Sequence, residues 1–350
     1  MKKTKILGLA LAGLAAVSLF AGCRSTTGSA NATKVAVITD LGGLNDRSFN
    51  ESAFNGLKSW ASEHNYKVSG AKGENYQAFQ SNSASDYTTN YNSAISAGYN
   101  LFFGIGYNLT PATKATAKAN PKLHFVIVDD VITGQKNVAS ASFADEQSAY
   151  LAGIAAAKAS KTGKIGFIGG MVSDVITAFQ VGFTKGAQSV NPNIKIDVQY
   201  ANSYTDASKG QTISASMYQS GADVVYQCAG GVGAGTFAEA KALNQNRTEA
   251  NKVWVIGVDQ DQNYLGSYKS KDGKESNFVL VSTVKEVGNV VKKIADENMQ
   301  GKFPGGKVEN ENLANGGVDL ALDNADSSIK SAVATAKQKI IDGKIKVPAK

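Results

Sequence analysis

The sequence predicts an α/β protein with two doubly wound lobes, and three observations support this. Short apolar runs rich in β-branched residues alternate with segments of helical periodicity, which is typical of parallel strands covered by helices on both faces. The chain has 350 residues, about twice the length of a common single domain. Eight or more strands in a chain of this length fit two sheets better than one, with a closed eightfold barrel as the competing arrangement.

The N-terminal segment has the pattern of a secretory signal. Three lysines precede an apolar run from Ile6 to Ala21, and a small-residue site follows it. The run is shorter than the roughly 20 residues that a membrane-spanning helix needs. Residues 1–22 are therefore predicted to be a removable signal peptide. Its removal takes three lysines from the net charge of +7 and leaves +4.

The end of this segment, Phe20-Ala21-Gly22-Cys23, resembles the processing site of bacterial lipoproteins. At such sites the Cys thiol is modified with lipid and the chain is cut just before it. An ordinary signal peptide with a coincidental Cys is the alternative, since Phe20 stands where Leu is usual. Residues 23–32 are small and polar, as in a flexible tether. We expect a lipid on Cys23 to hold the protein at the cell membrane, facing outside the cytoplasm.

The folded part is expected to begin near Thr33. The predicted strands are Lys34–Thr39, Leu101–Gly104, His124–Val128, Lys164–Ile168, Lys195–Tyr200, Val224–Cys228, Val253–Val258 and Phe278–Thr283. The predicted helices are Ser48–His64, Asp86–Ala97, Thr110–Ala119, Glu146–Ala159, Val175–Val190, Ala207–Ser220, Phe237–Asn244 and Glu286–Asn298. This alternation predicts right-handed βαβ units.

Acidic residues and glycine pairs follow several of the predicted strands. Asp40, Asp129 and Asp259 each come after an apolar run, and 169–170 and 230–231 are glycine pairs. Ligands of doubly wound sheets bind at the carboxyl ends of strands. Any one of these acids could be a helix cap, but together they predict a shared cleft.

The most informative segment is 39–54. It combines a strand end, a glycine turn and Ser48, which is expected to form a capping box with Glu51. This segment strongly resembles the basic membrane protein family of nucleoside-binding lipoproteins that serve ABC importers. The resemblance extends over nearly the whole mature chain through the further segments 143–153, 166–170, 179–183, 224–233, 256–260 and 282–285.

The resemblance implies a type I periplasmic-binding-protein fold, in which a three-strand hinge joins two α/β lobes. We expect residues 33–145 in the N-terminal lobe, together with about 260–283. The C-terminal lobe is expected to contain 146–259 and about 284–350. A purine nucleoside (guanosine, adenosine or inosine) would bind between the lobes, and an ABC permease would be the membrane partner. The family function is binding, so no catalytic residue and no cofactor are expected.

Aromatic side chains are suited to the flat faces of a purine, because stacking on an aromatic ring contributes roughly 1–3 kcal/mol per base. Phe49 is the first choice for one face, with Phe179 or Tyr226 for the other. Core packing is the alternative explanation for Phe179 and Tyr226. Gly231 would allow the backbone to approach the ligand closely.

Polar side chains are expected to hold the rest of the nucleoside. Asp129 and Asp259 could accept the vicinal ribose hydroxyls, while Lys285 could donate to a hydroxyl or balance the carboxylates. Asp40, Asp46 and Asn50 could recognise ring nitrogens or exocyclic groups. Because an asparagine amide both donates and accepts, Asn50 could tolerate more than one purine.

Composition argues against other classes of function. A modest positive charge without long basic runs disfavours nucleic-acid binding, and two His and two Cys disfavour a zinc site or a disulfide framework. A nucleoside hydrolase would need an acidic metal site, for which the acids at 129–130 and 259–261 are the candidates. The segment 230–235 fails the Gly-x-Gly-x-x-Gly dinucleotide fingerprint. A sugar or sugar-like signal is the alternative ligand.

Overall fold

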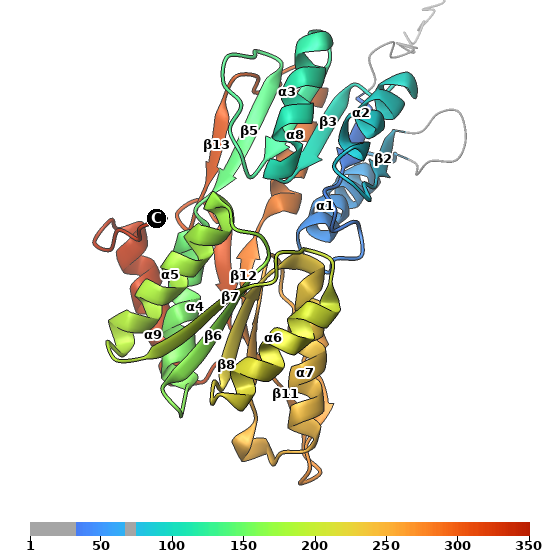
Figure 1. Cartoon of the computed structure of the whole chain (residues 1–350). Coiled ribbons are helices and arrows are strands. Elements are labelled where there is room, and N and C mark those ends of the chain that lie inside the picture. The colour runs from blue at the N-terminus through green and yellow to red at the C-terminus, as the bar shows by residue number, and fades with distance from the viewer. Residues whose placement is uncertain (1–32, 67–74) are drawn as a thin grey trace, which may run out of the picture. The chain divides into compact units, whose positions relative to one another are not determined.

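Two six-stranded sheets organise the part of the chain, residues 33–66 and 75–350, that the computed structural model describes (Figure 1). In spatial order the first consists of β13 (Val308–Glu311), β5 (Val138–Phe143), β4 (His124–Val128), β3 (Leu101–Ile105), β1 (Val35–Ile38) and β2 (Tyr76–Phe79). The second consists of β14 (Val318–Ala321), β12 (Val279–Lys285), β9 (Trp254–Gly257), β8 (Val224–Cys228), β6 (Lys164–Gly169) and β7 (Lys195–Tyr200). Neighbouring strands are parallel except β12 and β14.

Helices cover both faces of each sheet, and we call a sheet with its helices a lobe. The first lobe contains α1 (Phe49–Glu63), α2 (Asp86–Ser96), α3 (Thr110–Ala119) and α8 (Val287–Met299). The second contains α4 (Asp145–Ala159), α5 (Asp174–Val190), α6 (Ala207–Gln219), α7 (Gly233–Gln245), α9 (Ser327–Ile341) and the hairpin of β10 (Ser267–Lys269) and β11 (Glu275–Asn277). The predicted α/β class with two doubly wound sheets is confirmed.

Alternate residues of a single strand show why both faces need helices. Val35 and Val37 of β1 pack in the cluster that α1 and α8 cover. Ala36 and Ile38 point to the opposite face and pack with α2 and α3. Because successive side chains of a strand point to opposite faces, a strand buried on both sides must be apolar throughout.

The chain crosses between the lobes three times: from β5 to α4, from β12 to α8, and from β13 to β14. This agrees with the expected three-strand hinge. The expected assignment of about 260–283 to the first lobe is wrong, because β12 pairs with β9 in the second sheet. The segment that returns to the first lobe is 287–311, which contains α8 and β13.

Helices α1 and α8 fasten this returning segment to the first lobe. A Cβ on Gly56 of α1 would lie 2.3 Å from the backbone of Gly288 in α8. Only a residue without a side chain permits this approach. The start of α8, just after the second crossing, is therefore packed against the helix that begins at Phe49.

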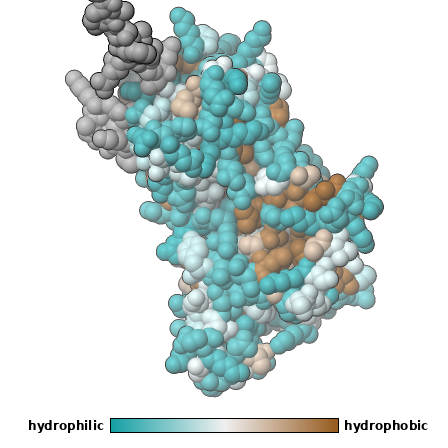
Figure 2. Space-filling model, turned by 180° about the vertical axis from the view of Figure 1, so that it is seen from behind, coloured by the Kyte–Doolittle hydropathy of each residue, from teal (hydrophilic) through white to brown (hydrophobic). Residues whose placement is uncertain are grey.

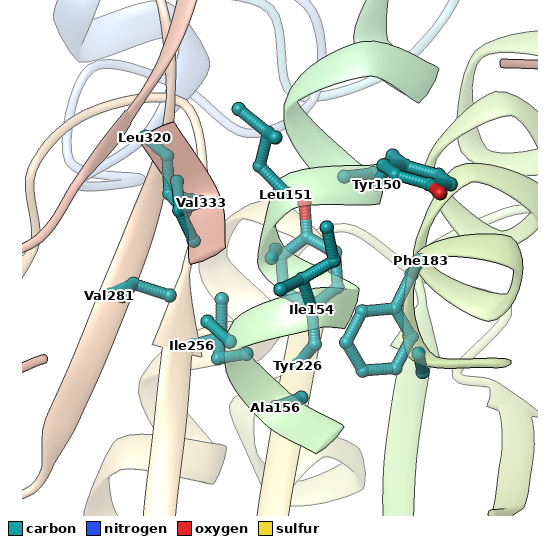
Figure 3. Close-up of a cluster of buried hydrophobic side chains, with 14 of the residues drawn as sticks. Tyr150, Leu151, Ile154, Ala156, Phe183, Tyr226, Ile256, Val281, Leu320 and Val333 are labelled. Carbon is teal, nitrogen blue, oxygen red and sulfur yellow. The ribbon is translucent and has the colours of Figure 1, made fainter. Parts of the chain in front are cut away.

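The largest core cluster belongs to the second lobe. Figure 3 shows Tyr226 of β8 among buried aliphatic and aromatic side chains from α4, α5 and the neighbouring strands. Its hydroxyl group lies 2.8 Å from Thr283 Oγ1 and is thereby hydrogen-bonded. Tyr226 is completely buried, so its role in this lobe is packing.

The surface seen in Figure 2 is mostly hydrophilic, with hydrophobic residues gathered in one area of that face. Among the residues that the structure describes, no helix is long and apolar enough to cross a membrane. The predicted signal peptide, Cys23 and the tether lie outside the described residues.

Candidate functional site

A pocket lies between the two lobes, where loops follow the carboxyl ends of strands from both sheets. Its cavity volume is about 60 Å³, smaller than the roughly 300–1,000 Å³ usual for small-molecule sites, so the lobes would have to move apart to admit a ligand of that size. Its walls are formed by Asp40, Gly42, Asp46, Phe49, Asn50, Gly106, Tyr107, Asp129, Val175, Ile176, Phe179, Tyr204, Cys228, Ala229, Gly230, Val258, Asp259 and Lys285. The strand-end acids are thus brought together as the sequence predicted.

Two phenyl rings line this pocket from opposite lobes. Phe49 is the first residue of α1 and Phe179 lies in the second turn of α5. The Lys285 ammonium lies 5.1 Å from the centroid of the Phe49 ring and 5.7 Å from that of Phe179. Tyr226 stands behind Phe179, with 6.4 Å between their centroids. The alternative choice of Tyr226 as a pocket wall is therefore wrong, and Phe179 occupies that position.

Lys285 lies in the pocket wall and is held by two carboxylates, of which only Asp129 also lines the pocket. Its Nζ lies 2.7 Å from Asp129 Oδ2 and 3.1 Å from Asp145 Oδ2. Burial by itself would lower the pKa of Lys285, but the neighbouring carboxylates Asp129, Asp145 and Asp259 outweigh it and raise the pKa. The lysine therefore carries its positive charge although only 3% of it is exposed.

Asp129 and Asp259 occupy equivalent positions in the two lobes. Each follows a central strand and has a left-handed backbone, with φ of 68° and 67°. Such a conformation is unusual outside glycine and is concentrated at functional sites. Asp259 accepts a hydrogen bond from the hydroxyl of Ser48, which belongs to the other lobe. Asp129 Oδ1 lies against Lys285 Nζ but accepts no hydrogen bond of good geometry.

Asp40, Asp46 and Asn50 form a hydrogen-bonded network at the start of α1. The Asn50 amide donates to Asp40 Oδ1 over 2.7 Å and to Asp46 Oδ2 over 2.9 Å. Its oxygen accepts the backbone N–H of Asp40. Asn50 therefore has both amide hydrogens occupied, and its main effect is to fix the Asp40 carboxylate.

Asp46, rather than Ser48, caps α1. The Asp46 carboxylate accepts the backbone N–H groups of Ser48, Asn50 and Glu51 over 2.8–3.1 Å. Ser48 occupies the N-cap position but makes no capping hydrogen bond, so the expected capping box with Glu51 is wrong. Because Asp46 satisfies the helix terminus, the Ser48 hydroxyl is available to the opposite lobe.

Burial changes the protonation of two carboxylates in the pocket. It raises the pKa of Asp40 to about 6, against the opposing hydrogen bonds from Asn50 and Gly42. It also raises the pKa of Asp259 to about 6, although Lys285 and Ser48 favour the charged form. Both groups titrate close to neutral pH as a result.

Further contacts across the pocket were not foreseen from the sequence. The hydroxyl oxygens of Tyr107 and Tyr204, from different lobes, lie 3.0 Å apart. Gln262 Nε2 donates to the Arg47 carbonyl over 2.8 Å. Gly230, with φ of 56°, lines the pocket in place of the expected Gly231. A glycine pair in the sequence indicates that the backbone lies close to a pocket or ligand. It does not indicate which of the two glycines makes that close approach.

The acids do not form a metal centre within the described parts of the chain, where no group of three or more His, Cys, Asp or Glu is arranged to hold a metal ion. The candidates at 129–130 and 259–261 are divided between different partners. Asp130 accepts from Thr110 Oγ1, and Asp261 accepts from the backbone N–H of Asn263. The metal-dependent hydrolase alternative thus has no site among these residues.

Comparisons with known proteins agree with this architecture. The family described as "ABC transporter substrate-binding protein PnrA-like" matches residues 32–350. The chain is 64% identical over 354 residues to the "ABC transporter nucleoside-binding protein BmpA" of Lactococcus lactis subsp. cremoris (strain MG1363), covering 99% of this chain and 100% of that protein. It is 31% identical over 336 residues to "Basic membrane protein A" of Borreliella afzelii, covering 94% and 96% of the two chains.

A solved structure shows the same fold at lower identity. An ABC transporter solute-binding protein from Aeropyrum pernix K1 superposes with a TM-score of 0.77 at 23% identity, covering 90% of this chain and 94% of that one. At this identity the likeness concerns the fold alone. It agrees with the expected periplasmic-binding-protein architecture.

Proposed function

The chain belongs to the PnrA-like family of ABC transporter substrate-binding proteins, and from this premise we propose that it binds purine nucleosides between its lobes. The family's role is binding rather than catalysis. The observation that carries the proposal is a pocket with a phenyl ring from each lobe and carboxylates beside them. The L. lactis relative is named as nucleoside-binding, which supports the same ligand class.

The base would lie between Phe49 and Phe179. These rings come from different lobes and both line the pocket, so a flat ligand between them would contact both lobes at once. Each stacking contact contributes roughly 1–3 kcal/mol. Such a ligand links the lobes more strongly than a small polar ligand would.

The ribose would be held by Asp129, Asp259 and Lys285. Asp129 lines the pocket with its Oδ1 against the Lys285 ammonium, and Asp259 lines the pocket with one oxygen used by Ser48. An ammonium group has three donors, and Asp129 and Asp145 accept two of them. One donor of Lys285 is thus left for a ligand oxygen.

The base edge would be recognised mainly by Asp40. Asp46 and Asn50 line the pocket too, but their hydrogen bonds are largely used within the network at the start of α1. They are better suited to support Asp40 than to read a base. Guanosine, adenosine and inosine remain the candidate ligands, because a carboxyl group with a pKa of about 6 can accept when charged and donate when protonated.

Delivery of the nucleoside would involve an ABC permease, and a lipid on Cys23 would keep the protein at the outer side of the cell membrane. This part of the proposal rests on the sequence Phe20-Ala-Gly-Cys23 and the polar tether that follows it. Family membership supports the permease as partner.

Calorimetry with guanosine, 2′-deoxyguanosine and free ribose tests the ligand and the residue roles together. Phe49→Ala removes a stacking surface, so guanosine should bind about tenfold or more weaker. Asp259→Ala should weaken guanosine more than 2′-deoxyguanosine, because the deoxy ligand lacks one of the hydroxyls that the carboxylate would accept. Ribose binding as tight as guanosine binding would replace the nucleoside proposal with a sugar receptor. Equal losses for both nucleosides in Asp259→Ala would remove that carboxylate from the ribose site.

A further inference from the structure

A buried ion cluster connects the pocket to the hinge. We call Lys285, Asp129 and Asp145 the hinge cluster. Lys285 ends β12 just before the second lobe crossing, and Asp145 begins α4 just after the first. Asp129 belongs to the first lobe, at the end of β4. The ammonium thus joins residues at two crossings to a pocket carboxylate.

Asp145 differs from the other two members because it does not line the pocket. It is 3% exposed, and its Oδ2 lies 3.1 Å from Lys285 Nζ. Its Oδ1 is buried and accepts no hydrogen bond from the described residues. Within the described chain, its side chain is therefore paired with the lysine.

We propose that Asp145 is a positioning residue for ligand binding, which holds the Lys285 ammonium at the pocket wall without touching the ligand. This rests on the proposed function, since it assigns a role within the same nucleoside site.

The side chain of a lysine is flexible. Its four-carbon stem has many rotamers, so a point charge at its end needs more than one anchor to stay in place. The Lys285 ammonium is anchored by Asp129 and Asp145 and lies 4.8 Å from the centroid of the Phe143 ring. With Asp145 removed, Asp129 would be the remaining strong anchor.

Without Asp145, the Asp129 carboxylate would have to serve both the Lys285 ammonium and the ligand. A carboxylate that must neutralise a buried ammonium alone is drawn toward it and accepts less well from another donor. Asp145 shares that task, so Asp129, whose Oδ1 lies 2.6 Å from the Lys285 ammonium, would be held less tightly to the lysine and could accept from the ligand. The effect of Asp145 on ligand affinity should consequently be transmitted through Lys285. It should be largest for ligands with both ribose hydroxyls.

A purely structural role for Asp145 is the competing explanation. It occupies the first turn of α4, where a negative charge stabilises a helix. Glu146 is a second acid in the same turn, and within the described residues it makes no ion pair with Lys285. Glu146→Gln is thus the matched control, because it removes a first-turn charge and leaves the hinge cluster intact.

A double-mutant cycle measured by calorimetry separates the two explanations. Asp145→Asn should weaken the binding of guanosine about tenfold and that of 2′-deoxyguanosine less. Glu146→Gln should change the affinity for either nucleoside by less than twofold. In a Lys285→Met background, Asp145→Asn should have less than a twofold further effect. A full tenfold loss of guanosine affinity from Asp145→Asn in the Lys285→Met background would overturn the proposal. A loss of affinity in Glu146→Gln equal to that in Asp145→Asn would also overturn it. Asp145→Glu keeps the carboxylate, so its affinity for guanosine should stay within about threefold of that of wild type. A loss of affinity above tenfold in this variant, with the fold intact, also overturns the proposal.

A ligand-free measurement distinguishes failure of this proposal from failure of the nucleoside function. The lysine ¹³Cε resonance missing from Lys285→Met identifies Lys285 in the spectrum of the whole protein. Asp145→Asn should shift that resonance and Glu146→Gln should not. If wild type binds no nucleoside but the resonance shifts, the nucleoside proposal fails while Asp145 still anchors Lys285. An unshifted resonance in Asp145→Asn means that Asp145 does not anchor the lysine.

Discussion

The pocket contains carboxyl groups whose pKa values are raised by burial. It also contains a lysine that neighbouring carboxylates keep protonated. Asp40 and Asp259 have pKa values raised to about 6, while Lys285 remains protonated between Asp129 and Asp145. Carboxylates destabilised in this way are a common feature of binding sites. Such buried carboxylates can bind a ligand, but they lower the stability of the folded protein.

We expect burial of Asp40 to lower the free energy of unfolding at neutral pH. Its pKa is about 6 in the folded protein and 3.8 as an unperturbed group, so between these pH values the native state binds more protons than the unfolded state. The free energy of unfolding should therefore fall as pH rises through this window, by up to about 3 kcal/mol for a shift of this size. Asp40→Asn should be more stable than wild type at pH 7.5, and the difference should vanish near pH 4. Urea unfolding at both pH values checks this, with Asp174→Asn at the surface as control. A variant that is less stable at pH 7.5 would contradict it.

Charge at the pocket predicts that nucleotides are rejected. Asp40, Asp46, Asp129 and Asp259 line it, and its lysine already pairs with two carboxylates. A phosphate placed there would face like charges, which costs several kcal/mol. Guanosine 5′-monophosphate should therefore bind at least about 100-fold more weakly than guanosine in competition calorimetry. A 5′-O-methyl derivative, larger but uncharged, is the control for size. Affinities within tenfold of each other would show that charge does not select the ligand.

Among the secondary-structure elements, the start of α1 has the most consequences for the site. Its cap is supplied from the preceding loop by Asp46, two residues before the N-cap position. This arrangement lets Phe49 and Asn50 face the pocket from the first turn, while Ser48 reaches Asp259 in the other lobe. One short segment thus supplies a stacking surface, a support for Asp40 and a contact between lobes.

The two residues before α1 should accordingly differ in their effects. Asp46→Ala removes the cap and should lower the free energy of unfolding by about 2 kcal/mol. Ser48→Ala removes no capping hydrogen bond, so it should cost about 1 kcal/mol or less in ligand-free protein. Chemical denaturation without nucleoside provides the comparison. A larger cost for Ser48→Ala would mean that the hydroxyl, after all, supports the helix.

For the described chain as a whole, three crossings join lobes that meet around the pocket. Ser48 with Asp259, Tyr107 with Tyr204, and Gln262 with Arg47 make hydrogen bonds from one lobe to the other. Few contacts of this kind need to break for a hinge to open. The pocket is thus bounded by surfaces that can separate.

Ligand binding should therefore close the lobes. Small-angle scattering with saturating guanosine should show a smaller radius of gyration than without it, since a ligand that contacts both rings stabilises the closed form. Phe179→Ala, which removes the contact in the second lobe, should reduce the change. An identical radius with and without bound guanosine would contradict hinge closure.

Attachment to the membrane should depend on Cys23. Cys23→Ser removes the thiol that lipid would modify, so the protein should lose lipid labelling and leave the membrane fraction. Nucleoside binding should be unchanged, because the pocket is formed by residues from Asp40 onward. Fractionation of cells followed by calorimetry tests both points. A serine variant that stays firmly in the membrane fraction would mean that the N-terminal segment itself is the anchor.

The class of fold and the central strands could be predicted from the amino-acid sequence alone. All eight predicted runs are strands in the structure. Strands buried on both faces are predominantly apolar, and all of these strands are buried in this way except β7, which is a partly exposed edge strand. The strands that were missed have weaker patterns. β13 is Val-Glu-Asn-Glu at a sheet edge, β2 and β14 are also edge strands, and β5 contains small residues. Their strand character comes from hydrogen bonds to a neighbour, which a local pattern does not record. Helix α9 was also not anticipated.

The neighbours of each residue, in contrast, could be read only from the folded chain. The sequence indicated Phe49, Asp129, Asp259 and Lys285 because they follow strands or begin a helix, and strand ends of one sheet necessarily meet at one edge. It could not choose Phe179 over Tyr226, because only the packing of α5 on β8 puts the Phe179 ring in the pocket wall and Tyr226 behind it. It missed Asp145, whose partner is 140 residues away, and it placed β12 in the wrong lobe. Local periodicity reports burial, whereas partners across a hinge depend on the path of the whole chain.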